Sequence, residues 1–186
     1  MRTLVAFTAA YTVGLFAYGL VVDSPLGNLY TGINIGLFVL FATLHRWAKW
    51  PNHALWAVSL VGLGNMLGGV LLVNGSPLYV ADLGGLPRYD KIFHAVAAAA
   101  MFIVAWEAMK RWAGTGYHLG GLLLWTWLVT MGGGAVVEVA EFVGSQIGNV
   151  NIGDLGNNAL DLVANGAGAL LGLWFVYRRE TSPTNA

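Results

Sequence analysis

The sequence has no cysteine, and it is poor in proline and in charged residues. Without cysteine, disulfides, thiolate metal ligands and a cysteine nucleophile are excluded, while the redox compartment is left open. Charged residues make up 10% of the positions, whereas a soluble domain carries about 25%. The formal net charge is zero, and no basic block or glycine-rich phosphate loop occurs. These absences argue against a soluble protein and against nucleic acid as a partner.

Long apolar runs are what the sequence has in abundance, with 57% hydrophobic residues. A membrane-spanning helix needs about 20 mostly apolar residues. Six segments approach that length, and turns rich in Gly, Pro, Asn and Ser separate them. Their approximate ranges are 3–22, 31–48, 53–73, 91–110, 119–143 and 158–177. We therefore predict an all-α fold, a polytopic bundle of six transmembrane helices. A single membrane domain is expected over 1–180, with a polar cytoplasmic tail at 181–186.

The distribution of Lys and Arg predicts the orientation of these helices. With the N-terminus inside, only Arg88 and Lys91 fall on the outer side. The cytoplasmic side then holds the other seven basic residues: Arg2, Arg46, Lys49, Lys110, Arg111, Arg178 and Arg179. We expect a multi-pass protein of the plasma membrane, surrounded by membrane lipid. Both termini should be cytoplasmic, and the loops 74–90 and 144–157 extracytoplasmic.

Ionisable residues occur at the outer ends of the fourth and fifth predicted helices. Asp90 and His94 are four residues apart and share a helix face, as do Glu138 and Glu141 at a spacing of three. Glu138 lies about 8 Å below the outer end of its predicted helix, by the rise per residue. An ionisable group in hydrocarbon costs a few kcal/mol, so these positions indicate a function.

The sixth predicted helix adds a polar stripe at the same side of the membrane. Asn157, Asp161 and Asn165 recur at a spacing of four, and Asp154 lies in the preceding loop. Because the predicted orientation puts these residues and those of the fourth and fifth helices in one leaflet, we expect one shared cavity.

Three chemistries fit this group of side chains. A divalent metal ion of unknown identity could be held by His94, Glu138, Glu141 and Asp161, since one imidazole with carboxylates suits several such ions. The residues Asp90, Asp154, Asn157 and Asn165 would then support the ligands. Glu138 and His94 are the first candidates for catalysis. No residues indicate an organic cofactor.

The second chemistry is a proton or cation pathway through buried acids. The third is structural: Asn157 or Asn158 could cap the sixth helix, Asp90 could cap the fourth, and Arg88 or Lys91 could neutralise a carboxylate.

Two stretches carry a family resemblance over residues 89–172. The segment from Tyr89 to His94 resembles the Asp-Lys/Arg, then His opening of a helix in YjdF-like membrane proteins and, more loosely, in the VanZ-like group. The Glu-x-x-Glu-Phe pattern at 138–142, followed by Asp-x-x-x-Asn-x-x-Gly at 161–168, is similar to the YjdF-like pattern. The resemblance implies a multi-helix membrane protein with signature residues His94, Glu138, Glu141, Asp161 and Asn165. It implies no particular activity.

We therefore expect a site open to the extracytoplasmic face that binds a metal and acts on a lipid or cell-envelope substrate. The alternatives are a small proton- or cation-coupled transporter and a non-catalytic membrane protein. The sequence leaves open whether the protein is an enzyme, and it does not indicate the oligomeric state.

Overall fold

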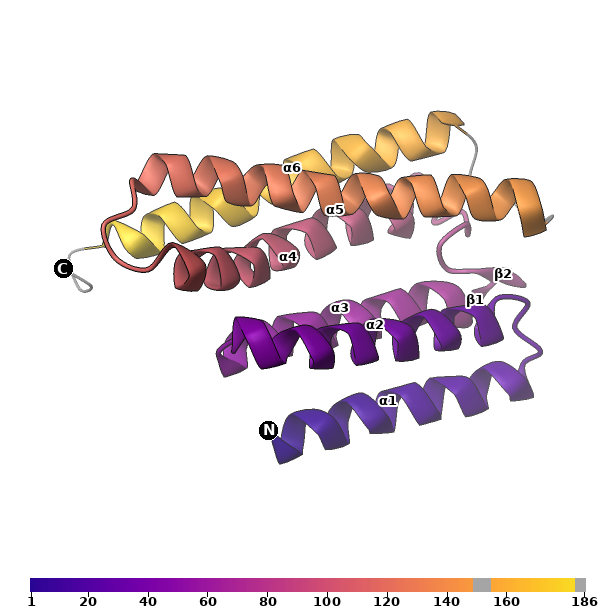
Figure 1. Ribbon diagram of the computed structural model, residues 1–186. Coiled ribbons are helices and arrows are strands. Elements are labelled where there is room, and N and C mark those ends of the chain that lie inside the picture. Colours follow the sequence, from indigo (N-terminus) through magenta and orange to yellow (C-terminus); the bar gives the residue numbers. More distant parts are fainter. Residues whose placement is uncertain (149–154, 183–186) are drawn as a thin grey trace. The chain divides into compact units, whose positions relative to one another are not determined.

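The computed structural model describes residues 1–148 and 155–182. Over these residues, six helices are each long and apolar enough to cross a membrane (Figure 1). The helices are α1 (Arg2–Val21), α2 (Gly27–Ala48), α3 (Asn52–Val70), α4 (Tyr89–Ala113), α5 (Leu119–Gly148) and α6 (Leu155–Glu180). The all-α fold with six spanning-length helices is thus confirmed. The last residues of the predicted tail, 183–186, lie outside the described part.

The chain divides into two compact units, Met1–Phe93 and His94–Ala186. The sequence, which favoured one membrane domain, contains no change in composition that would predict this division. The boundary falls inside α4, so the first turn of this continuous helix is counted with the first unit.

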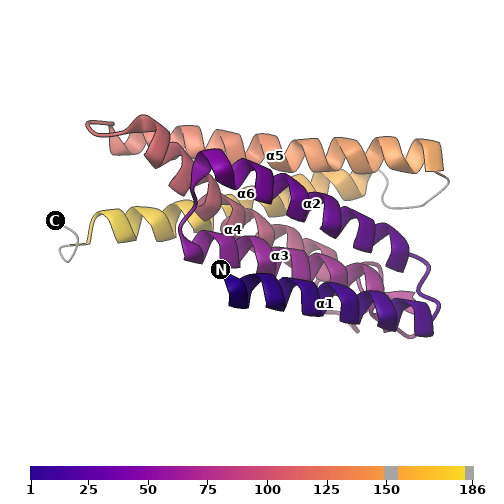
Figure 2. The same cartoon turned by 60° about the horizontal axis from the view of Figure 1, so that its bottom comes forward.

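The first unit consists of three helices that all contact one another, α1, α2 and α3 (Figures 1 and 2). Polar side chains join them: the Thr8 and Ser59 hydroxyls are 2.7 Å apart, and Asn34 Nδ2 donates to Thr12 Oγ1 over 2.9 Å. In lipid, association of helices depends on such hydrogen bonds and on close packing of small residues. Gly69 provides the close packing, because a Cβ there would overlap the ring of Tyr30.

A short hairpin ends the third helix earlier than the apolar run suggests. The strands β1 (Leu72–Val73) and β2 (Ser76–Pro77) are antiparallel, with Leu72 opposite Pro77 and Val73 opposite Ser76. Between them, Asn74 and Gly75 have φ angles of 52° and 80°. An Asn-Gly pair at positive φ is typical of a two-residue hairpin turn. The hairpin therefore takes residues that hydropathy alone assigned to the helix.

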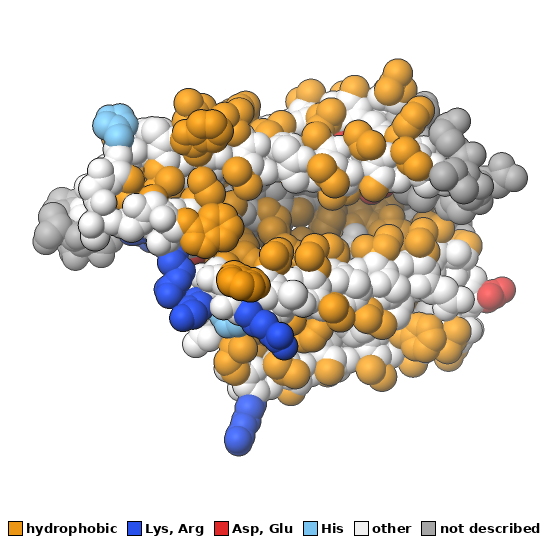
Figure 3. Space-filling view, in the orientation of Figure 1, with side chains coloured by type: hydrophobic (Ala, Val, Ile, Leu, Met, Phe, Trp, Pro, Cys, Tyr) orange, Lys and Arg blue, Asp and Glu red, His pale blue; other side chains and the backbone are white. Residues whose placement is uncertain are grey.

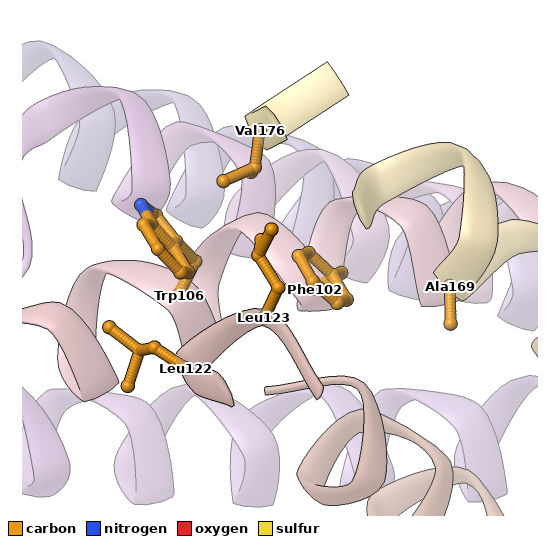
Figure 4. Packing of buried hydrophobic residues seen from close by; sticks show 6 residues of the cluster. All are labelled: Phe102, Trp106, Leu122, Leu123, Ala169 and Val176. Carbon is orange, nitrogen blue, oxygen red and sulfur yellow. The ribbon is translucent and has the colours of Figure 1, made fainter. Parts of the chain in front are cut away.

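The second unit packs α4, α5 and α6 around one apolar cluster (Figure 4). Its buried members are Phe102 and Trp106 from α4, Leu122 and Leu123 from α5, and Ala169 and Val176 from α6. At Gly168 of α6, an added Cβ would overlap the carbonyl of Ala95 in α4. The two helices thus approach each other almost backbone to backbone.

Ion pairs join α4 and α6 at the end of the unit that lies farthest from His94. Glu180 accepts from Lys110 Nζ over 2.5 Å and from Trp106 Nε1 over 3.3 Å. Arg179 Nη2 donates to Glu107 Oε1 over 2.8 Å. These contacts fix the two helices to each other at their basic ends.

Side-chain polarity is reversed relative to a soluble protein. Large apolar side chains are exposed on the helix faces, for example Val136 at 69% and Leu171 at 61% (Figure 3). Polar side chains such as Thr126 and Asp161 are fully buried. This distribution is the one expected of helices whose outer faces contact lipid.

Candidate functional site

The candidate site lies in the second unit and is centred on the imidazole of His94. The residue is buried at 8% exposure on the second turn of α4. Its Nδ1 is 3.3 Å from Asn165 Oδ1 and 3.4 Å from Glu138 Oε1. Its Nε2 is 3.7 Å from Asp161 Oδ1. The ring therefore lies between two buried carboxylates, one from α5 and one from α6.

Two asparagines of α6 connect this helix to Glu138. Asn165 Nδ2 donates to Glu138 Oε1 over 3.3 Å, and Asn158 Nδ2 donates to the Glu138 backbone carbonyl over 2.8 Å. Gly134 makes room for the first contact, since a Cβ there would lie 3.0 Å from Asn165 Nδ2. One glycine of the triplet 132–134 thus serves packing, and α5 continues as a helix through all three.

The carboxylate of Asp161 is the most deeply buried acid of the site, with a side-chain exposure of 0%. Asn157, one turn earlier on α6, donates from Nδ2 to Asp161 Oδ2 over 2.6 Å. The polar stripe predicted at a spacing of four is therefore present: Asn157 and Asn165 contact carboxylates, and Asp161 lies between them.

The contacts of His94 favour one tautomer of its ring, with a hydrogen on Nδ1. Two oxygen acceptors face Nδ1, because Asn165 uses its amide nitrogen to donate to Glu138 and turns its amide oxygen to the ring. An imidazole nitrogen facing two acceptors must carry a hydrogen. In this tautomer the Nε2 lone pair faces the Asp161 carboxylate, and a metal ion or a second proton between them would relieve the repulsion.

Asp90 lies one helical turn before His94 on the same helix and is half-buried. Asp90, His94 and Asp161 each offer a ligand atom, and these atoms lie within 4.8 Å of one another. Lys91 Nζ is 3.0 Å from Asp90 Oδ2. Glu138, in contrast, faces the other ring nitrogen of His94.

The remaining predicted site residues are placed as follows. Glu141 lies one turn beyond Glu138 on α5 and is half-buried, and its role as a ligand stays a prediction. Asp154 lies outside the described residues.

The capping interpretation is wrong for three positions. The sixth helix begins at Leu155, so Asn157 and Asn158 lie within it, and Asp90 lies inside the first turn of α4. The sequence suggested Asn158 only as a helix cap and did not indicate its contact with Glu138. Its spacing of three from Asp161 and seven from Asn165, which places all three on one helix face, is the signal that could have found it.

Comparison with known proteins supports the membrane assignment over nearly the whole chain. A family model described as "Predicted membrane protein (DUF2238)" matches residues 3–182. No curated protein matched the chain, and no solved structure matched it either. The family match thus covers much more of the chain than residues 89–172, where the sequence motifs lie. It does not confirm the YjdF-like or VanZ-like resemblance. The chain is a multi-pass helical membrane protein that belongs to the DUF2238 family.

Proposed function

We propose that the protein binds one divalent metal ion within the membrane, through His94 Nε2, Asp161 and Asp90. In this proposal Glu138 is the carboxylate that accepts the Nδ1 proton of His94, rather than a ligand. Metal-binding histidines usually donate their second ring N–H to a carboxylate or carbonyl in this way. The observation that carries the proposal is the placement of the His94 ring, whose Nδ1 faces the oxygens of Asn165 and Glu138 and whose Nε2 faces Asp161.

Distances and charges are compatible with such an ion. Ligand atoms bound at about 2.1 Å from one ion lie at most about 4.2 Å apart. Atoms of Asp90, His94 and Asp161 within 4.8 Å of one another would therefore close on an ion with small side-chain movements. A double positive charge together with that of Lys91 would balance the carboxylates of Asp90, Asp161 and Glu138, and removing water from unbalanced carboxylates is costly.

The ion would polarise a phosphoryl or carbonyl oxygen of a substrate or activate a water molecule. Among the residues of the chain, Glu138 and Asn165 would orient His94, and Asn157 would orient Asp161 through its hydrogen bond. The substrate we propose is a lipid or another cell-envelope molecule. Such a molecule can reach a site in the extracytoplasmic half of the bilayer sideways from the membrane or from outside.

Elemental analysis of the full-length protein, purified without chelator, tests the proposal. Wild-type protein is expected to contain one divalent ion per chain. The Asp161→Asn variant should lose it, because an amide oxygen lacks the charge of the ligand it replaces. Glu138→Gln should retain the ion at saturating metal but bind it about 10- to 100-fold more weakly, as loss of an outer-shell partner does.

The matched control is Asp82→Asn, the same chemical change at an exposed loop residue. It should leave the metal content unchanged. Wild-type protein without stoichiometric metal would overturn the proposal. A folded Asp161→Asn variant that still contains one metal ion per chain would overturn it as well.

A second function is favoured by one specific observation: both nitrogens of His94 face a carboxylate. A doubly protonated ring would satisfy Glu138 and Asp161 together, and the site would then carry a proton for coupled transport. Nitrogen-15 NMR of the histidine side chains in metal-free protein distinguishes the two functions. A doubly protonated His94 supports proton coupling, whereas an Nε2 resonance that shifts on addition of metal supports the metal site.

A further inference from the structure

A groove of about 460 Å³ lies at the basic end of α6, far along this helix from the candidate metal site. It is lined by Trp174, Phe175, Arg178, Arg179 and Ser182. Asp161 and Arg178 are separated by about 25 Å of helix, from the rise per residue. The groove is therefore a separate feature of the second unit, and its interpretation does not depend on the metal proposal.

The walls of the groove are apolar and open. Trp174 is 60% exposed and Phe175 is 51% exposed. The guanidinium of Arg178 lies over the Trp174 ring, 6.0 Å from its centre. Trp side chains favour the boundary between hydrocarbon and headgroups, so these residues are suited to contact the upper acyl chain of a lipid.

The two arginines of the groove have different surroundings. Arg179 is held by Glu107 and Glu180, so its position is fixed by the ion pairs between α4 and α6. Arg178 is exposed, and no ion pair among the described residues includes it. Its charge is available to an external anion.

The local charge balance is positive. Among the described residues at this end of the unit, Lys110 and Arg111 of α4 join the two arginines of α6, and the acidic residues are Glu107 and Glu180. The C-terminal carbonyls of α6 carry a partial negative charge that opposes an anion on the helix axis. The groove residues, however, carry full positive charges on the side of the helix.

We infer that this groove binds an anionic phospholipid, with the lipid phosphate at Arg178 and the acyl chain against Trp174 and Phe175. A basic cluster at a helix end attracts anionic headgroups, with each Lys or Arg adding a share of the affinity. A free phosphate ion would leave the two aromatic walls unused. The combination of charge and apolar surface therefore favours a lipid.

Short-chain lipid titrated into the purified full-length protein in nonionic detergent tests the inference. The probes are dioctanoyl phosphatidylglycerol, dioctanoyl phosphatidylcholine and inorganic phosphate, with native mass spectrometry measuring the bound fraction. Phosphatidylglycerol should bind more tightly than phosphatidylcholine, and phosphate should not compete at equal concentration. Arg178→Gln should weaken phosphatidylglycerol binding about fivefold, which corresponds to one basic residue at the membrane surface.

Arg111→Gln is the matched control, because Arg111 is exposed at the same end of the unit but does not line the groove. It should leave the affinity almost unchanged. Trp174→Leu, which keeps an apolar wall but removes the ring under Arg178, should weaken binding of both phospholipids.

Equal losses of affinity for phosphatidylglycerol in Arg178→Gln and Arg111→Gln would overturn the inference, because they would indicate a general attraction of the lipid to positive charge. Equal affinity for phosphatidylcholine and phosphatidylglycerol, or displacement by phosphate, would overturn it as well.

Discussion

Gly168 and Gly132 are both glycines within membrane helices, and their surroundings are opposite. A Cβ at Gly168 would overlap the Ala95 carbonyl, whereas a Cβ at Gly132 would have no atom within 4 Å. The first glycine is therefore needed for contact between α4 and α6. The second only weakens the helix, since glycine in a helix interior is less favourable than alanine by about 0.5–1 kcal/mol.

We predict that Gly168→Ala lowers the melting temperature of the detergent-solubilised protein, whereas Gly132→Ala leaves it unchanged or raises it. The backbone of Ala95 cannot move aside as a flexible side chain could, so α4 and α6 must separate. Overpacking of this kind costs about 1–3 kcal/mol. Thermal unfolding followed by circular dichroism measures both variants. A Gly168→Ala protein as stable as wild type would contradict the close approach of the two helices.

At the scale of secondary-structure elements, one face of α6 carries its buried residues, which pack against α4 and α5. Asn158, Asp161 and Asn165 are buried on this face near the site, and Gly168 and Gly172 continue it toward the apolar cluster. Of these residues, Asn165 contacts both other helices, through His94 of α4 and Glu138 of α5. Asn165 therefore couples all three helices.

Replacing this asparagine tests the coupling. Asn165→Leu should destabilise the protein by about 1–3 kcal/mol for each buried polar group that loses its partner. The control is Ala167→Leu, a larger apolar enlargement on the exposed side of the same helix, which should have little effect. Both stabilities can be measured by urea unfolding in micelles. Similar losses in the two variants would mean that the amide of Asn165 contributes nothing specific.

Hydropathy predicted the number of helices correctly, but it made the fifth and sixth helices too short at the loop that joins them. The loop predicted at 144–157 begins too early, because Gly144 and Ser145 lie within α5, which continues to Gly148. Similarly, Gly156 and Asn157 were assigned to a loop, although α6 begins at Leu155. In a membrane protein, packing against neighbouring helices outweighs the weak intrinsic preferences of such residues.

Spacing along the helices also predicted that His94, Glu138, Asp161 and Asn165 would gather, and the structure places them together. It could not predict which ring nitrogen of His94 faces which carboxylate. That detail depends on how the three helices are rotated about their axes relative to one another. The spacing of residues along a single helix contains no information on this rotation. For this reason the sequence counted Glu138 among the ligands, whereas the proposal now gives it an orienting role.

At the scale of the whole molecule, most basic residues of each unit lie at one of its ends. In the first unit, Arg2 begins α1, and Arg46 and Lys49 lie at the end of α2, which runs back along α1. In the second unit, the last turns of α4 and α6 carry the basic residues. The rule that cytoplasmic connections are rich in Lys and Arg then predicts that both basic ends face the cytoplasm.

Cysteine labelling tests this orientation, and the absence of native cysteine makes every introduced thiol unique. Gly75 is a poor position, because its φ angle of 80° would strain a cysteine. Leu86, which is 68% exposed in the loop between β2 and α4, is a better choice. Thr115, exposed in the loop between α4 and α5, reports the other side.

With an impermeant maleimide on intact cells, Leu86→Cys should be labelled and Thr115→Cys should be labelled only after lysis. The reverse pattern would place His94, Glu138 and Asp161 in the cytoplasmic half of the bilayer, where a cell-envelope substrate arriving from outside could not reach them.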